Sequence, residues 1–150
     1  MVDEIDKSIL SALQTDCTLS VDDISDRVNL SRNACWRRIK TMENAGLITK
    51  RVALLDPAKA GCPLTAIVLL RTSQHDTKWI AKFTQVLESM PEVVGASRMT
   101  GDLDYVLRVR LKDMPAYDTF YKDLTSRISV LDISASFVME EIKETTAVPL

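Results

Sequence analysis

The 150-residue chain is 46% hydrophobic and 27% charged, with a net charge of −2. This composition suits one globular domain or two very small ones, and it excludes an intrinsically disordered chain. No apolar run approaches the ~20 residues that a membrane helix needs, so no membrane partner is expected. The first ten residues, MVDEIDKSIL, are acidic and lack the basic-then-apolar order of a signal peptide, which indicates a cytoplasmic protein.

The sequence offers no pattern for a metal or cofactor. Cys17, Cys35 and Cys62 are odd in number and form no Cys-x-x-Cys pair, which favours small buried thiols over a disulfide framework or a zinc site. The single histidine, His75, lies in a polar stretch and is not expected to act as a ligand or a catalyst. We therefore expect no cofactor.

Positive charge is concentrated in one short segment. Residues 1–30 carry two basic and seven acidic residues, whereas residues 31–51 carry six basic residues and one acidic residue. Residues 52–150 have a net charge of only −2. A charged segment is often just a solvated face, so its meaning depends on the structure that it forms.

Three helices are predicted in the first 46 residues. Apolar residues at helical spacing favour a helix over 3–14. Ser20, followed three positions later by Asp23, is a capping box that begins a second, short helix. Ser31 caps a third helix, which ends before Gly46. Two helices joined by a short polar break indicate a helix-turn-helix.

The third predicted helix separates an apolar stripe from a basic face. Cys35, Ile39 and Met42 face the core, and the opposite face carries the exposed aromatic Trp36. A recognition helix contacts base edges and phosphates through such a face. Base contacts are expected from Asn33, Trp36, Arg37 and Lys40, and phosphate contacts from Arg32, Arg38, Lys50 and Arg51.

The remaining residues predict a second domain. Residues 47–55 alternate loosely, as in a strand closing a small wing, and the Pro and Gly of residues 56–61 mark a linker. Beyond it the pattern is β-α-β-β-α-β, typical of a ferredoxin-like sheet with two helices on one face. The expected domains are 1–50, a linker strand and hinge at 51–61, and 62–150. The expected strands are 64–71, 92–100, 105–111 and 132–142.

Six motifs together resemble one family. They are D-E-I-D-K-S-I-L-S-A-L-Q at 3–14, L-S-R-N-A-C-W-R-R-I-K-T-M-E-N-A-G-L-I at 30–48, L-D-P-A-K-A-G at 55–61, P-E-V at 91–93, T-G-D-L-D-Y-V-L-R-V at 100–109 and M-E-E-I-K-E-T-T-A-V-P-L at 139–150. In this order and spacing they resemble the Lrp/AsnC transcription regulators of bacteria and archaea. The resemblance implies an α+β fold, with a winged helix-turn-helix followed by a ferredoxin-like (RAM) domain that binds an amino-acid effector and forms oligomers.

Three shorter stretches resemble a cysteine-responsive subgroup of that family. They are D-C-T-L-S at 16–20, A-C-W-R-R-I-K at 34–40 and V-A-L-L-D-P at 52–57. This resemblance implies L-cysteine as the effector and the gene of a cysteine-degrading desulfhydrase as a target.

The family resemblance also implies an effector site beside the Gly101–Tyr105 turn, at a contact between two dimers. Glycine permits close backbone approach, free amides can bind a carboxylate, and acidic side chains can bind an ammonium. The alternative is a plain hairpin turn whose aspartates cap local amides. The candidate effector residues are Thr100, Gly101, Asp102, Asp104, Tyr105, Ser134 and Ser136.

We expect a sequence-specific, double-stranded-DNA-binding regulator, not an enzyme. A dimer is expected because a second chain can cover the open face of the sheet, and tetramers or octamers can follow. An alternative is an enzyme resembling siroheme decarboxylases, but one histidine and no nucleophile–base pair disfavour it. A nucleoid-packaging protein differs from a regulator only in its specificity for DNA sequence.

Overall fold

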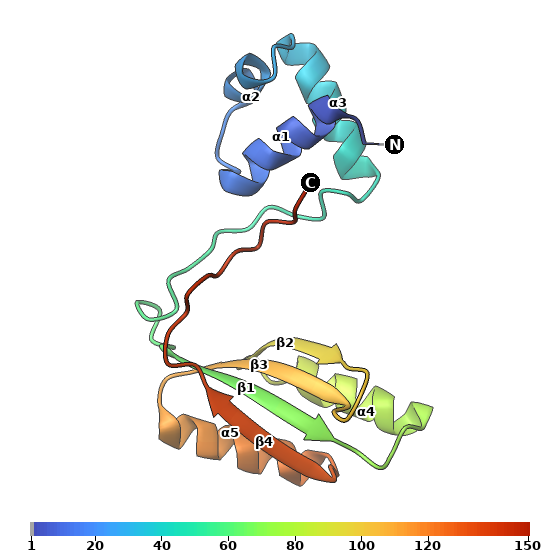
Figure 1. Cartoon of the computed structure of the whole chain (residues 1–150), viewed down its shortest axis with the longest axis vertical. Coiled ribbons are helices and arrows are strands. Elements are labelled where there is room, and N and C mark those ends of the chain that lie inside the picture. Colours follow the sequence, from blue (N-terminus) through green and yellow to red (C-terminus); the bar gives the residue numbers. More distant parts are fainter. Residues whose placement is uncertain (1) are drawn as a thin grey trace. The chain divides into compact units, whose positions relative to one another are not determined.

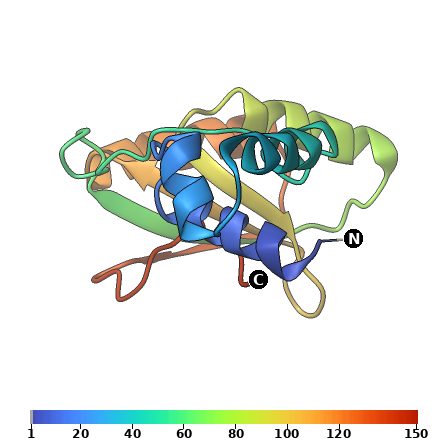
Figure 2. The same cartoon turned by 90° about the horizontal axis from the view of Figure 1, so that it is seen from above.

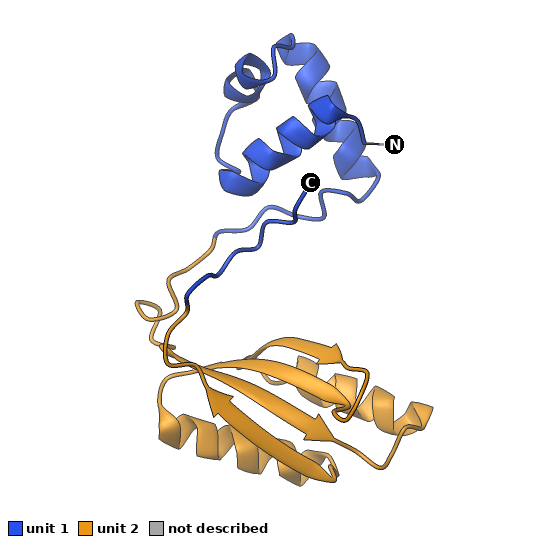
Figure 3. Cartoon of the chain, viewed as in Figure 1, with its two compact units in different colours: residues 1–53, 142–150 blue, residues 54–141 orange. Residues whose placement is uncertain are grey.

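The computed structural model describes residues 2–150, which form two compact units. One unit contains residues up to Ala53 together with Ile142–Leu150, and the other is Leu54–Glu141 (Figure 3). Residues 62–141 of the expected second domain lie in the second unit, and residues 142–150 group with the N-terminal unit. Among the described residues, no helix is long and apolar enough to cross a membrane.

The N-terminal unit contains α1 (Glu4–Thr15), α2 (Val21–Arg27) and α3 (Arg32–Asn44) (Figures 1 and 2). The caps predicted at Ser20 and Ser31 are present, and Asp3 forms a third, with a capping box to Asp6. Asn29, in the turn between α2 and α3, has a φ of 52°. Asparagine tolerates this left-handed conformation better than most residues, so it ends α2 and lets α3 begin at once.

The core of this unit is formed by one face of each helix. The predicted apolar stripe of α3 is confirmed, since Cys35, Ile39 and Met42 are at most 5% exposed. They pack with Ile9, Leu10, Leu13 and Ile24.

The strand predicted over 47–55 is wrong. Residues 49–56, all of which the structure describes, adopt no regular secondary structure. Val52, Leu54 and Leu55 are 51–76% exposed. Loose alternation favours a strand only where a neighbouring strand satisfies its backbone groups, and an isolated ribbon is marginal in water.

The second unit has the predicted β-α-β-β-α-β order (Figure 1). Its four antiparallel strands lie in the spatial order β2-β3-β1-β4. The last strand ends five residues earlier than predicted, at Phe137. The elements are β1 (Leu64–Arg71), α4 (Thr77–Glu88), β2 (Val93–Arg98), β3 (Tyr105–Leu111), α5 (Met114–Arg127) and β4 (Asp132–Phe137).

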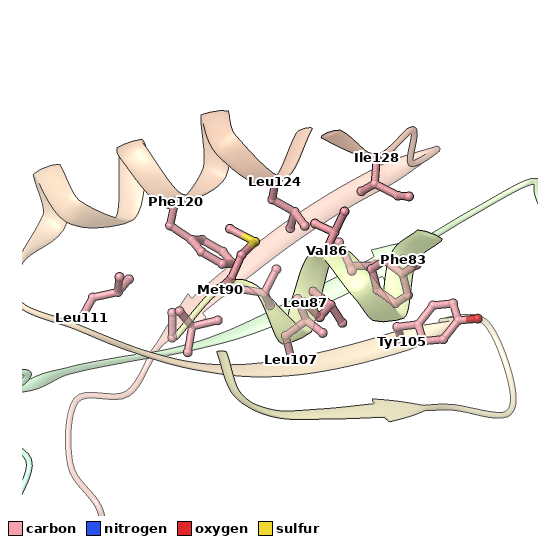
Figure 4. Packing of buried hydrophobic residues seen from close by; sticks show 14 of the residues in the cluster. Phe83, Val86, Leu87, Met90, Tyr105, Leu107, Leu111, Phe120, Leu124 and Ile128 are labelled. Atoms are coloured by element: carbon pink, nitrogen blue, oxygen red, sulfur yellow. The ribbon is translucent and has the colours of Figure 1, made fainter. Parts of the chain in front are cut away.

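Side chains between the two helices and the sheet form the core of this unit (Figure 4). Alternate residues of β1 and β3 point into it, including Val68 and Leu107, both 0% exposed. Trp79 is buried as well, although its polar neighbours obscured it in the sequence, and its Nε1–H donates to the carbonyl of Ser129. Tyr121, on α5, is 38% exposed.

The opposite face of the sheet is less well covered. Ile67, Leu69 and Val106 alternate with the core residues and are half-buried in the single chain. Leu69 pairs with Val106 on one side and Ser134 on the other. This face combines apolar and small polar side chains with Arg108 and Arg110 of β3.

Candidate nucleic-acid interface and effector turn

The surface of α3 away from the core carries the predicted polar and aromatic residues. Asn33, Arg37 and Lys40 are exposed, and Trp36 is 52% exposed. A large indole left in water at the surface of a helix-turn-helix is available to contact a base or sugar. The structure therefore brings the four residues expected to contact bases together on one side of α3.

Arg38 differs from the expectation of a free phosphate contact. Its Nη1 lies 2.8 Å from Asp3 Oδ2 and 2.8 Å from Asp6 Oδ1, both at the start of α1. The hydrogen bond that Arg38 donates to Asp6, and then the one that it donates to Asp3, raise the pKa of the Arg38 guanidinium. The hydrogen bond from the Asp6 backbone, followed by that from Arg38, lowers the pKa of Asp3. Arg38 thus fastens α3 to α1.

Three other cations of the basic segment pair with acidic residues at the surface. Arg32 Nε lies 3.0 Å from Asp22 Oδ1, and Glu43 accepts hydrogen bonds from Lys40 and Arg51 at 2.6 and 3.2 Å. The hydrogen bond from Lys40, with a smaller effect of Arg51, lowers the pKa of Glu43. Exposed pairs contribute little net stability, so a DNA phosphate can replace the carboxylate at modest cost.

Two cations of the segment remain without an ionic partner. In the part of the chain that the structure describes, neither Arg37 nor Lys50 forms an ion pair. Arg37 lies in the middle of the exposed surface of α3, where a guanidinium can reach the edge of a guanine.

The turn between β2 and β3 is held by its own backbone and by one carboxylate. Met99 N–H donates to the Asp104 carbonyl at 2.8 Å, and Asp104 N–H donates to the Leu70 carbonyl at 3.0 Å. Asp104 Oδ2 accepts from Thr72 N–H at 2.8 Å. Gly101 has a φ of 101°, which favours glycine. Asp104 therefore holds an amide on the segment that follows β1, 32 positions earlier in the chain, and not an amide of its own turn.

The other predicted effector residues lie in different surroundings. Thr100, Gly101 and Asp102 are exposed at the tip of the turn. Tyr105 is 7% exposed, and its ring packs 4.7 Å from that of Phe83 (centroid to centroid), so its side chain belongs to the core. Only its backbone remains near the turn.

Ser134 and Ser136 lie on the open face of the sheet. Ser134 pairs with Leu69, next to the end of β1 where Leu70 meets the turn, and Ser136 pairs with Ile67, two residues further away. The structure therefore brings Ser134 closer to the turn than Ser136.

A surface groove that the sequence reasoning missed leads away from this turn. It has a volume of about 370 Å³, lies between α4 and β2, and reaches Arg98 and Tyr105 at the two ends of the turn. Ile80, Phe83 and Leu87 supply apolar walls. The signal in the sequence is the small residue Ala96, whose pairing with the buried Leu107 places it on the face of β2 that is turned toward the helices.

In the residues that the structure describes, no group of three or more His, Cys, Asp or Glu could hold a metal ion. Cys35 lies in the core of the N-terminal unit, and burial raises the pKa of its thiol. The thiol therefore stays protonated near neutral pH, and Cys35 packs as a small apolar side chain.

A helix-turn-helix with an exposed basic face, joined to a β-α-β-β-α-β unit, defines a DNA-binding regulator with a separate ligand-binding module. Family models agree: residues 2–49 match a winged helix-turn-helix DNA-binding domain, and residues 65–148 match the Lrp/AsnC ligand binding domain. The chain belongs to the Lrp/AsnC family of transcriptional regulators.

Named relatives are similar along their full length. The DNA-binding transcriptional activator DecR of Escherichia coli K12 is 46% identical, with 100% of this chain and 99% of the relative covered. The glutamate uptake regulatory protein of Zymomonas mobilis is 42% identical, with 99% and 91% covered.

Solved structures have the same fold. An AsnC family regulator from Agrobacterium tumefaciens is 48% identical with a TM-score of 0.95, covering 98% of this chain and 96% of that one. A transcriptional regulator from Neisseria meningitidis, solved as a complex with L-Met, is 35% identical with a TM-score of 0.94, covering 99% and 97%.

Proposed function

We propose that this regulator reads double-stranded DNA through α3 and that a small amino acid modulates its binding. The observation that carries the proposal is the exposed surface of α3, where Asn33, Trp36, Arg37 and Lys40 share one side. Arg37, without a carboxylate partner, is assigned to a base edge. Lys40, predicted from the sequence to contact a base, is assigned to a phosphate instead, because its ammonium is a point charge. Arg32, Lys50 and Arg51 also supply charge to phosphates.

Arg38 receives a different role in this proposal. Because two carboxylates of α1 already hold its guanidinium, it sets the position of α3 and does not contact DNA. Removing it would disturb the helix-turn-helix itself, whereas removing Arg37 would leave the fold intact.

The effector is proposed to be a small zwitterionic amino acid, with L-cysteine the first to test. Free amides at the tip of the turn can take its carboxylate, and the exposed Asp102 can pair with its ammonium. Asp104 acts mainly by shaping the turn through Thr72. The L-Met complex of the Neisseria regulator supports an amino-acid ligand. The adjoining groove offers space for an apolar side chain.

The working form is proposed to be a cytoplasmic homodimer or a larger assembly of dimers. A single helix-turn-helix makes too few contacts for tight binding, so two copies on two half-sites are expected. The half-buried Ile67, Leu69 and Val106 offer the apolar surface for pairing two sheets.

The test begins with selection of bound sequences from a library of random duplexes. The selected duplex is then compared with a scrambled duplex of equal length and composition, with and without each amino acid. The proposal predicts preference for the selected duplex and a change in affinity with at least one amino acid. Equal binding of the two duplexes would instead favour nucleoid packaging.

A further inference from the structure

One end of the groove between α4 and β2 carries two polar groups without a partner. In the part of the chain that the structure describes, neither the Arg98 guanidinium nor the Tyr105 hydroxyl forms a hydrogen bond or an ion pair. The two residues pair across β2 and β3, and the Tyr105 side chain belongs to the core. Arg98 therefore projects from the same, helix-facing side of the sheet, where both groups can reach one ligand.

The Tyr105 hydroxyl is the stronger indication of a ligand. Tyr105 is only 7% exposed, yet within residues 2–150 no fully buried side-chain nitrogen or oxygen lacks a hydrogen-bond partner. Its unpartnered oxygen therefore reaches solvent, on a residue that lines the groove. Figure 4 shows this oxygen pointing away from the labelled apolar side chains. A tyrosine buried to this extent usually has a partner for its hydroxyl, and a molecule in the groove supplies one.

The rest of the groove is mainly apolar. Ile80, Phe83 and Leu87 of α4 line it, as does Val94 of β2, which is 47% exposed. Its volume of about 370 Å³ lies within the range of small-molecule sites. Along β2, the strand rises about 13 Å from Val94 to Arg98. The groove therefore suits an elongated apolar group with a polar end at Arg98.

The charges in the groove indicate which polar end it accepts. A guanidinium and a tyrosine hydroxyl both donate hydrogen bonds to a carboxylate. Among the described residues, Glu88 is the one carboxylate that lines the groove, and it ends α4, near the start of β2 and away from Arg98. An ammonium beside the ligand's carboxylate would meet Arg98 and find no acidic partner. The tip of the turn differs in this respect, because the exposed Asp102 is available there.

We propose that this groove is a second small-molecule site, which binds a monocarboxylate with an apolar tail and no α-amino group. The carboxylate accepts hydrogen bonds from Arg98 and Tyr105, and the tail passes Ala96 toward Val94. The bound tail takes the space that a long effector side chain would use. The groove and the turn are therefore filled together only when the amino-acid effector is small, as L-cysteine is.

Octanoate is a suitable probe, because its extended chain is shorter than the strand from Val94 to Arg98. Isothermal titration calorimetry of the full chain should show saturable octanoate binding, and binding of 2-aminooctanoate that is about tenfold weaker. Absence of saturable octanoate binding would overturn the proposal. If 2-aminooctanoate binds as tightly as octanoate or more tightly, the groove belongs to the amino-acid effector site, and this inference fails while the proposed function stands.

Substitutions test the two polar contacts and the groove itself. Tyr105→Phe keeps the ring in the core and should weaken octanoate binding about tenfold, with an unchanged midpoint of thermal unfolding. Arg98→Gln should weaken binding about three- to fivefold, as for an exposed ion pair, and Lys82→Gln, on α4 outside the groove, should not. Ala96→Leu, at an exposed position, fills the groove and should abolish binding.

Unchanged octanoate affinity in Tyr105→Phe or Ala96→Leu would contradict the site. Equal effects of Arg98→Gln and Lys82→Gln would show a general response to surface charge and would also overturn the proposal. No DNA enters these measurements, so their outcome is independent of the assignment of α3 to DNA.

Discussion

Substitution of Arg37 by Ala separates reading of the DNA sequence from general attraction to DNA. Loss of a guanidinium that contacts a base edge costs about 1–3 kcal/mol with the correct sequence. This corresponds to a loss of about five- to 150-fold in affinity. Because a base contact is made only with the correct sequence, the preference for the selected duplex over its scrambled counterpart should fall by a similar factor.

The dependence of DNA affinity on salt concentration measures the phosphate contacts. Five cations of the basic segment are available to DNA in the proposal: Arg32, Arg37, Lys40, Lys50 and Arg51. If the four cations other than Arg37 contact phosphates, each helix-turn-helix makes four phosphate contacts. The logarithm of its affinity for DNA then falls with the logarithm of the salt concentration, with a slope of about −3.6. Lys50→Ala should reduce this slope by about 0.9 and weaken both duplexes equally.

Fluorescence anisotropy with labelled duplexes at several salt concentrations measures both effects. Arg38→Ala is the contrasting variant, because it breaks the connection to Asp3 and Asp6. It should lower the midpoint of thermal unfolding of the N-terminal unit, whereas Arg37→Ala should leave this midpoint unchanged. If Arg37→Ala weakens the selected and scrambled duplexes by the same factor, the assignment of Arg37 to a base is refuted.

Three further predictions follow from the turn, the sheet face and the caps. Asp102→Asn should weaken binding of the amino-acid effector about ten- to a hundredfold, since a charge-assisted hydrogen bond contributes ~1.5–3 kcal/mol; unchanged affinity by calorimetry would contradict the ammonium contact. Leu69→Asp, on the open sheet face, should shift the chain from dimer to monomer by light scattering at micromolar concentration, and a dimeric mass would reject this face as the interface. Hydrogen bonds lower the pKa of Asp3 and Asp23 in the folded chain, chiefly those from the Asp6 backbone and the Ser20 side chain respectively. Their stabilising contribution is therefore full above about pH 4, the ordinary aspartate pKa, and is lost as the pH falls from there through the lowered folded-state pKa. Helical circular dichroism of Asp23→Asn should show weaker acid dependence than the wild-type chain.

Local features were predictable from the sequence because their causes lie within a few residues. The caps at Ser20 and Ser31 use backbone groups three positions away, and Gly101 takes the left-handed conformation that a tight turn requires. Alternation in Tyr105–Leu111 defined the inner face of β3, since adjacent residues of a strand point to opposite sides.

Long-range partners were not predictable in the same way. Arg38 looked like one more cation of the basic segment, but its carboxylate partners lie 32 and 35 positions earlier in the chain. The contact between Gln14 and Val148 spans 134 positions. Periodicity carries no information about such pairs, because they depend on how separate elements pack. The failure of the strand over 47–55 has the same origin: a strand depends on a neighbour that its own sequence does not specify.

Linkage between the two ligands tests the central claim most directly. The affinity for the selected duplex is measured with each of the twenty amino acids, and the affinity for any active amino acid is measured with and without that duplex. Coupling between two binding sites is reciprocal. The active amino acid, with L-cysteine the first candidate, should therefore change the protein's affinity for the duplex by a certain factor. The duplex should change the protein's affinity for that amino acid by the same factor. If no amino acid alters duplex binding, the account of an effector-modulated regulator is contradicted.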